Sequence, residues 1–268
     1  MRSTLISLAL VGLLATGFAG SALAGEAYAP IKLEAAKSIQ PSPELIADAT
    51  ALLANVKKGD GDAIGLGLAS KVTTIDGSID MAFPRNKVVI GPYKTTEDML
   101  VALSGTIGGD VPTAPDGSDD PKLHIAAERE FIVQSLTDSQ PWGADPMVKG
   151  AVCTYAYRSF DAKALQKLAD KLGIQSSGFV YVTAPYELKK TPADSAAAAG
   201  TLAPDLLYAL DYKTDAPRNW IAVHLPEGGT AFARMSVAKF DKPYATGLCF
   251  NKNKAGKWVV VAQVATSL

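Results

Sequence analysis

The sequence has little of what nucleic-acid-binding and metal-binding proteins need. Its 268 residues carry 26 basic and 27 acidic side chains, so the formal net charge is −1. A nucleic-acid-binding domain normally carries a clear basic excess. Histidine occurs only twice, as His124 and His224, and neither has a second histidine or a cysteine at the spacing of a zinc ligand. We therefore expect no nucleic-acid partner, no metal and no cofactor.

The sequence signatures of common enzymes are also missing. The chain has no Gly-x-Ser-x-Gly turn for a hydrolase nucleophile, no P-loop and no dinucleotide-binding glycine fingerprint. One acidic loop, with Asp116, Asp119 and Asp120, could hold calcium loosely, although a solvated acidic loop is the simpler interpretation. We therefore assign no catalytic residue from sequence motifs.

Apolar runs long enough to cross a membrane, which takes about 20 residues, are absent as well. The run Leu5–Phe18 follows the basic Arg2 and ends shortly before the small residues Ala22 and Ala24. This order is typical of a secretory signal peptide. We predict that residues 1–24 are removed and that the mature protein, without a membrane span, is periplasmic or secreted. A short anchoring helix is the alternative.

Cysteine is scarce, since only Cys153 and Cys249 occur. In an exported protein an even pair of cysteines favours one disulfide, because the compartment is oxidising. Two buried thiols are the alternative. A disulfide between these two residues would close a loop of roughly 100 residues, to which the chain-entropy model assigns about 4.7 kcal/mol.

The chain does contain clear helical patterning before about residue 175. Residues 25–42 show no sustained period, and we predict a tether there. Ser42, Pro43 and Glu44 then form the pattern of a helix start. In the α-rich region, 43–175, the apolar spacing predicts helices at 43–58, 62–70, 95–107, 123–136 and 161–172, and a short strand at 88–90.

From residue 176 to 268 short strand-like runs alternate with turns, beginning with Phe179–Val182. The fold class is therefore α+β, with the α-rich region first. Two groups in that region could carry chemistry. The carboxylates that we would nominate for acid–base catalysis are Asp98, Glu128, Glu130 and Asp145. An aromatic cluster with one arginine could stack on a sugar, although an alternating strand explains its spacing more simply: Tyr155, Tyr157, Arg158 and Phe160.

A set of short runs after residue 178 follows a definite order. The runs are Tyr186–Lys190, a loop with Pro192, Gly200–Leu202, the apolar Leu206–Leu210, Asn219–Val223 around Trp220, a turn at Gly228 and Ala231–Ala233. In this order, residues 179–240 resemble a bacterial SH3-type domain, a small β-barrel common in exported bacterial proteins. The resemblance implies a barrel with Trp220, Phe232 and Tyr208 as ligand-binding aromatics. A hairpin that contains Cys249 would follow it, tied back to Cys153.

The resemblance also implies a function. SH3-type domains of exported proteins act as binding or scaffolding modules, so we expect a non-catalytic cell-envelope protein whose partner is peptidoglycan or another envelope protein. A cell-wall hydrolase with its site in the α-rich region is one alternative, and a structural subunit is another. Two carboxylates about 5–9.5 Å apart in one cleft would favour the hydrolase. A large exposed apolar patch would favour the subunit.

Overall fold

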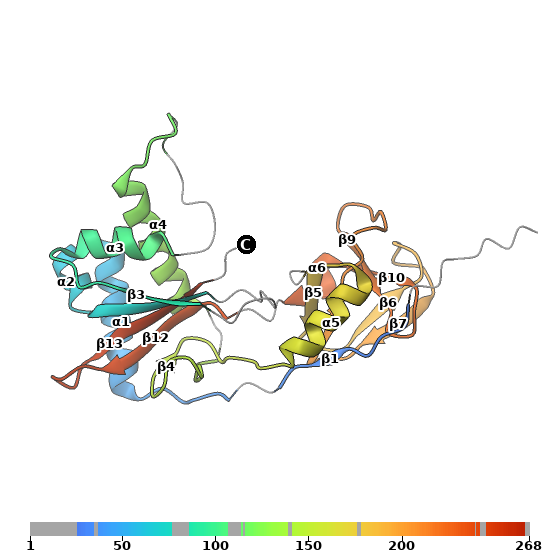
Figure 1. Ribbon diagram of the computed structural model, residues 1–268, viewed down its shortest axis with the longest axis horizontal. Helices are drawn as coiled ribbons and strands as arrows, with labels where there is room; N and C mark the ends of the chain where they lie inside the picture. Colours follow the sequence, from blue (N-terminus) through green and yellow to red (C-terminus); the bar gives the residue numbers. More distant parts are fainter. Residues whose placement is uncertain are drawn as a thin grey trace, which may run out of the picture.

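The computed structural model of the chain is drawn in Figure 1. It describes residues 26–34, 37–76, 86–106, 114, 116–138, 141–175, 178–238, 240–241 and 245–265. The predicted signal peptide, residues 1–24, lies outside these residues. None of the described helices has the length and apolar character that a membrane span requires. The elements gather in two parts (Figure 1): a helical part, from 37–157 and 245–265, and a strand part, from 26–34 and 158–241.

The helical part is built on a five-stranded sheet with the order β3-β2-β13-β12-β4, in which only β13 and β2 are parallel neighbours. The strands are β2 (Leu68–Asp76), β3 (Lys87–Ile90), β4 (Val152–Cys153), β12 (Gly247–Lys252) and β13 (Trp258–Ala265). The helices are α1 (Pro43–Lys58), α2 (Gly61–Gly65), α3 (Thr96–Ser104) and α4 (Pro121–Thr137). Leu45 of α1 and Ile132 of α4 share a core with Phe250 of β12, so these helices pack on one face of the sheet.

Capping side chains set the helix boundaries. Ser42 accepts a hydrogen bond from the Leu45 amide at the start of α1, and Gly59 ends the helix with a φ of 76°. That left-handed conformation strains residues with a Cβ, which is why glycine suits the position. Three further helices, including α5 (Ala162–Leu172), begin in the same way after Thr95, Asp120 and Asp161. The predicted helices at these four places are confirmed.

The helix predicted over 62–70 is wrong in its second half. Helix α2 ends at Gly65, and the chain enters β2 at Leu68. Gly65 and Gly67 lower the helix propensity of this stretch. Leu68 and Val72 instead bury their side chains in the core beneath the helices. Tertiary packing of the strand therefore outweighs the local helical pattern.

The C-terminal hairpin lies in the helical part, whereas we expected it to be appended to a barrel. Strand β13 pairs with β2, and β12 pairs with β4. Phe250 and Val260 are buried in the core that α1 and α4 share. Val264 is buried on the opposite face of the sheet, with Ile75. A strand whose two faces are both buried usually has a nearly continuous run of apolar residues, and the sequence of β13 is such a run.

A disulfide joins Cys153 of β4 to Cys249 of β12, as predicted. The two residues are direct cross-strand partners, with Cα atoms 3.9 Å apart. The backbone N–H and C=O of Cys153 bond to Gly143 on the other side of β4. The cysteines therefore occupy a non-hydrogen-bonded pair, the position at which antiparallel strands approach most closely.

The strand part contains two four-stranded sheets, β1-β8-β5-β11 and β7-β6-β10-β9. An isolated β-bridge between Leu210 and Val223 connects them. The helices together with the mixed sheets fit the predicted α+β class. The described residues form no closed barrel, and the barrel stays a prediction. The strands are β1 (Ile31–Lys32), β5 (Phe179–Val182), β6 (Tyr186–Lys189), β7 (Ala198–Leu202), β8 (Leu206–Ala209), β9 (Trp220–His224), β10 (Thr230–Arg234) and β11 (Phe240–Asp241), and the short helix α6 (Met235–Ala238) follows β10.

Helix α5 belongs with these sheets, although its sequence falls in the predicted α-rich region. Leu165 and Leu168 of α5 pack with Phe179 of β5 and Leu207 of β8. The apolar side of α5 covers one face of the sheet β1-β8-β5-β11. The opposite face of this sheet packs in a separate core with Val223 and the neighbouring apolar residues of β9 and β10. A boundary near residue 175 therefore does not separate the two parts of the structure.

The segment predicted as a tether is an ordered strap in its described residues. Strand β1 pairs with β8, and Leu33 is only 1% exposed. Further on, Ser38 bridges to Gly143 of the helical part. Figure 1 shows this segment running along both parts of the molecule. The sequence does not indicate this strand, because isolated apolar residues such as Tyr28 and Leu33 are buried here without any sustained period.

Candidate functional site

The outward face of β9 and β10 carries two of the three aromatics predicted to bind a ligand. In this antiparallel pair Trp220 lies opposite Arg234, and Phe232 lies opposite Ala222. Directly opposite residues point to the same side of a sheet, and the intervening residues point to the other. The intervening Ala231 is fully buried in the core, as are Val223 and Ala233, so Trp220, Phe232 and Arg234 share the outward face. Both aromatic rings are partly exposed.

Two cations flank these rings. Lys189 of β6 lies opposite Phe232, and its Nζ donates to Glu187 Oε1 at 2.7 Å. Arg234 Nη1 donates to Asp194 Oδ2 at 2.6 Å. Solvent-exposed ion pairs of this kind contribute only about 0–1 kcal/mol, so a ligand carboxylate could replace either acidic partner at little cost. We name the set Trp220, Phe232, Arg234 and Lys189 the aromatic face.

Tyr208, the third predicted aromatic, is not part of the aromatic face. It lies on β8, is 3% exposed and packs inside the strand part. Its hydroxyl accepts a hydrogen bond from the Ala203 amide at 2.8 Å, and burial raises the pKa of the phenol. Tyr208 lies in an apolar run, and such a run is typical of a core strand as well as of a strand that binds a ligand. The sequence alone therefore does not show whether this tyrosine is buried or exposed.

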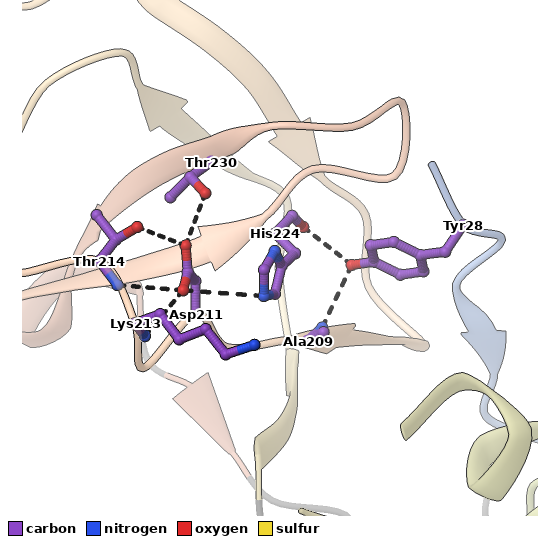
Figure 2. A network of polar contacts seen from close by, with 7 residues as sticks. All are labelled: Tyr28, Ala209, Asp211, Lys213, Thr214, His224 and Thr230. Atoms are coloured by element: carbon purple, nitrogen blue, oxygen red, sulfur yellow. Dashed lines mark hydrogen bonds and ion pairs between the residues drawn. The ribbon is translucent and has the colours of Figure 1, made fainter. Parts of the chain in front are cut away.

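A polar network is centred on Asp211 (Figure 2). It reaches β9 through His224 and β10 through Thr230. Asp211 Oδ2 accepts hydrogen bonds from the hydroxyls of Thr214 and Thr230 at 2.6 and 2.7 Å. Its Oδ1 accepts from the backbone amides of Lys213 and Thr214 at 3.0 and 3.2 Å. Burial raises the pKa of Asp211, but these hydrogen bonds outweigh it and bring the pKa below its usual value. With four donors on its two oxygens, Asp211 is a structural acceptor that fixes the 211–214 turn to β10.

His224 and Tyr28 extend this network to the strap (Figure 2). His224 Nε2 lies 3.9 Å from Asp211 Oδ1, and its backbone carbonyl accepts a hydrogen bond from the Tyr28 hydroxyl at 2.9 Å. The same hydroxyl accepts from the Ala209 amide at 3.3 Å. Burial raises the pKa of Tyr28 to about 12. Tyr28 thus links β8 to β9, which makes it a residue that positions the strand bearing Trp220.

The four nominated carboxylates do not assemble into a catalytic site in the described contacts. Glu128 is 0% exposed, and burial raises its pKa to about 8 although Gln263 Nε2 donates to its Oε2 at 3.3 Å. Asp145 is buried and accepts a hydrogen bond from the Tyr155 hydroxyl at 2.6 Å. Asp98 and Glu130 are exposed, on α3 and α4. The two buried carboxylates therefore have different hydrogen-bond partners, and the two exposed carboxylates lie on different helices.

The aromatic cluster after Cys153 is not an alternating strand, because β4 ends at Cys153 itself. Tyr155 is buried beside the disulfide. The Arg158 guanidinium lies 5.0 Å from the centre of the Tyr181 ring and pairs with Asp205. Tyr155 is therefore a core residue, and Arg158 joins β5 to the turn before β8.

The structure brings together Ser104, His124 and Asp119, an array that the sequence did not predict. Ser104 Oγ lies 2.8 Å from His124 Nδ1, and His124 Nε2 lies 2.5 Å from Asp119 Oδ1. The order of contacts is that of a nucleophile, a base and an acid. However, Ser104 is 0% exposed, and its hydroxyl donates to the Val101 carbonyl at 2.8 Å. Because Ser104 is buried, a substrate does not reach its hydroxyl in this structure, and no sequence motif marks the array.

No group of three metal-ligating side chains occurs among the described residues. No family model matches this sequence, and neither a curated protein nor a solved structure shows significant similarity to it. The aromatic face is the candidate site in which partly exposed aromatic and cationic residues share one side of neighbouring strands.

Proposed function

We propose that this protein is an exported, non-catalytic binding protein of the cell envelope and that it holds cell-wall material on the aromatic face. The observation that carries the proposal is the placement of Trp220 and Phe232, partly exposed, on one outward face of neighbouring strands. Diagonal neighbours across a strand pair lie roughly 7–8 Å apart, which allows one ligand to contact both rings.

The chemistry of the face suits peptidoglycan. Large aromatic rings bury apolar area without many rotatable bonds, and the apolar faces of sugar rings can stack on them. Arg234 and Lys189 add charges that pair with carboxylates, which the peptide stems of peptidoglycan carry. The network around Asp211 and Tyr28 fixes β9 and β10, so the face is formed before the ligand arrives. A preformed site loses little free energy to ordering on binding.

Two further features support export and the proposed class. The signal-peptide pattern at residues 1–24 predicts delivery to an oxidising compartment, and the Cys153–Cys249 disulfide fits such a compartment. The order of short strands after residue 178 supports the resemblance to SH3-type domains. We propose peptidoglycan as the ligand because of the aromatic and cationic side chains of the aromatic face.

Co-sedimentation with purified peptidoglycan tests the proposal. The chain without residues 1–24 should pellet with the polymer, and Trp220→Ala and Phe232→Ala should each reduce the bound fraction about tenfold or more, as aromatic anchors do. Tyr93→Ala is the matched control, because Tyr93 is 48% exposed and lies in the helical part. Failure of the parent chain to pellet would refute a wall ligand and direct the search to envelope proteins. Equal pelleting by all variants would refute the aromatic face as the site.

A further inference from the structure

Strand β3 is the last strand at one side of the five-stranded sheet (Figure 1). One of its edges pairs with β2, and no other strand of the described residues bonds to it. Val88 and Val89 are 55% and 58% exposed, although adjacent residues of a strand point to opposite faces of a sheet. At these two residues β3 therefore presents apolar side chains to solvent on both faces, beside an edge that the described part of the chain does not cover.

The register of β2 and β3 determines which backbone groups point away from the sheet. The Asp76 amide donates to the Asn86 carbonyl at 2.9 Å, so these opposite residues form a hydrogen-bonded pair. Such pairs alternate along two antiparallel strands with non-hydrogen-bonded pairs. Two residues further on, Val88 again bonds to β2, whereas Lys87 and Val89 direct their N–H and C=O groups to the outer edge.

We propose that the outer edge of β3 is a self-association site, to which a second copy of this chain adds its own β3 in antiparallel orientation about a two-fold axis. In this register Val88 faces Val88 of the second copy at the axis, and Lys87 faces Val89 of the second copy on either side. Each Lys87–Val89 pair joins residues with outward N–H and C=O groups, so each pair exchanges two hydrogen bonds. The two Val88 residues then form a non-hydrogen-bonded pair, in which side chains approach most closely.

The charge and shape of the strand favour a copy of itself as the occupant. Lys87 is the only charged residue of β3, and the register places it opposite a valine instead of opposite the lysine of the second copy. Like charges directly opposite each other would destabilise a strand pair. Val88 meets Val88, and Val89 meets the aliphatic stem of Lys87, whose ammonium group can stay in water.

The size of the contact sets the strength that we expect. A pair of four-residue strands buries less than the roughly 1,200–2,000 Å² of stable complexes. The dimer should therefore form reversibly and only at high protein concentration. Because β3 belongs to the helical part, this association does not depend on the aromatic face.

Cysteine substitutions at two neighbouring positions test the register in the chain without residues 1–24. The Cys153–Cys249 pair shows that a non-hydrogen-bonded site in this protein accommodates a disulfide, with Cα atoms 3.9 Å apart. Val88→Cys places two cysteines at such a site across the axis, and we expect a disulfide-linked dimer on oxidation. Val89→Cys is the matched control, because Val89 is as exposed but its two copies are diagonal neighbours. Diagonal neighbours lie roughly 7–8 Å apart, beyond the reach of a disulfide.

Sedimentation velocity over a wide range of concentration tests association without a cross-link. The parent chain should pass from monomer to dimer as its concentration rises. Val89→Pro should weaken the dimer about tenfold or more, because it removes two outward N–H groups per dimer. The bonds from β3 to β2 remain, and circular dichroism checks the fold. A monomeric parent at every concentration, equal cross-linking by Val88→Cys and Val89→Cys, or a folded Val89→Pro chain that associates like the parent would overturn the proposal.

Discussion

Replacing Glu128 by glutamine should change how the stability of the helical part depends on pH. Glu128 is fully buried on α4, with Gln263 as its hydrogen-bond donor and with Oε1 unpartnered in the described structure. Burial disfavours the ionised carboxyl and raises its pKa from 4.5 to about 8. Between about pH 4.5 and pH 8 the Glu128 carboxyl is ionised in the unfolded chain and protonated in the folded chain. Folding therefore takes up a proton in this pH range.

The sign and size of the effect follow from linkage. Below pH 4.5 the carboxyl is protonated in both states, so it causes no penalty. As the pH rises to about 8 the free energy of unfolding falls, and the full penalty applies above that value. Each pH unit corresponds to about 1.4 kcal/mol, so the loss is at most roughly 5 kcal/mol. Glutamine never ionises, but its buried amide costs about 1–3 kcal/mol at all pH values.

We therefore expect Glu128→Gln to be less stable than the parent at pH 4, by about 1–3 kcal/mol, and more stable at pH 9, by roughly 2–4 kcal/mol. Urea unfolding followed through Trp142 and Trp258, which pack against the same core, reports on this part of the molecule. Glu130→Gln is the control, because Glu130 is exposed on the same helix. Parallel stability curves for the parent and Glu128→Gln across this range would refute the reasoning.

Three further predictions concern links within each part. Replacing Cys153 and Cys249 together by serine should lower the free energy of unfolding by roughly 2–5 kcal/mol, measured by denaturant unfolding against the disulfide-bonded parent; an unchanged value would contradict the long-loop argument. Tyr28→Phe should cost about 1–3 kcal/mol, because the buried Ala209 amide loses its acceptor, and should speed proteolysis of residues 26–34; unchanged cleavage would show that the strap is held by other contacts. Asp211→Asn should cost about 1–2 kcal/mol at pH 7, since one threonine hydroxyl loses its best acceptor. Because the folded pKa of Asp211 is lowered, that advantage of the parent should be present above the ordinary value of 3.8 and disappear as thermal unfolding is repeated at lower pH.

Local signals predicted the helices well. Ser42 with Pro43 at the start and Gly59 at the end of α1 are caps whose hydrogen bonds involve near neighbours in the chain, so the sequence contains all that is needed. The strap and β2 could not be found in this way. Tyr28, Leu33 and Leu68 are buried by partners far away in the sequence, and no period marks them. The hairpin of β12 and β13 was recognisable as a hairpin, but its parallel partner β2 is set by tertiary packing alone.

The candidate site shows the same division. Trp220 and Phe232 were nominated through the resemblance, and the register of β9 and β10 then places them on one face. Tyr208 stands in an apolar run that suits a core strand as well as a binding strand, so only burial separates the two roles. Asp211 needs Thr230 from another strand, and no motif joins such a pair. Contacts of this kind depend on strand pairing, which spacing along the chain does not determine.

The most direct test of the account is a titration of the protein with soluble peptidoglycan fragments, followed by tryptophan fluorescence. Trp142 and Trp258 pack against the core of the helical part, whereas Trp220 stands on the aromatic face. The account predicts a saturable change in emission that Trp220→Phe removes while the fold, checked by circular dichroism, stays intact. A change that persists in Trp220→Phe, or no change with the parent chain, would contradict it.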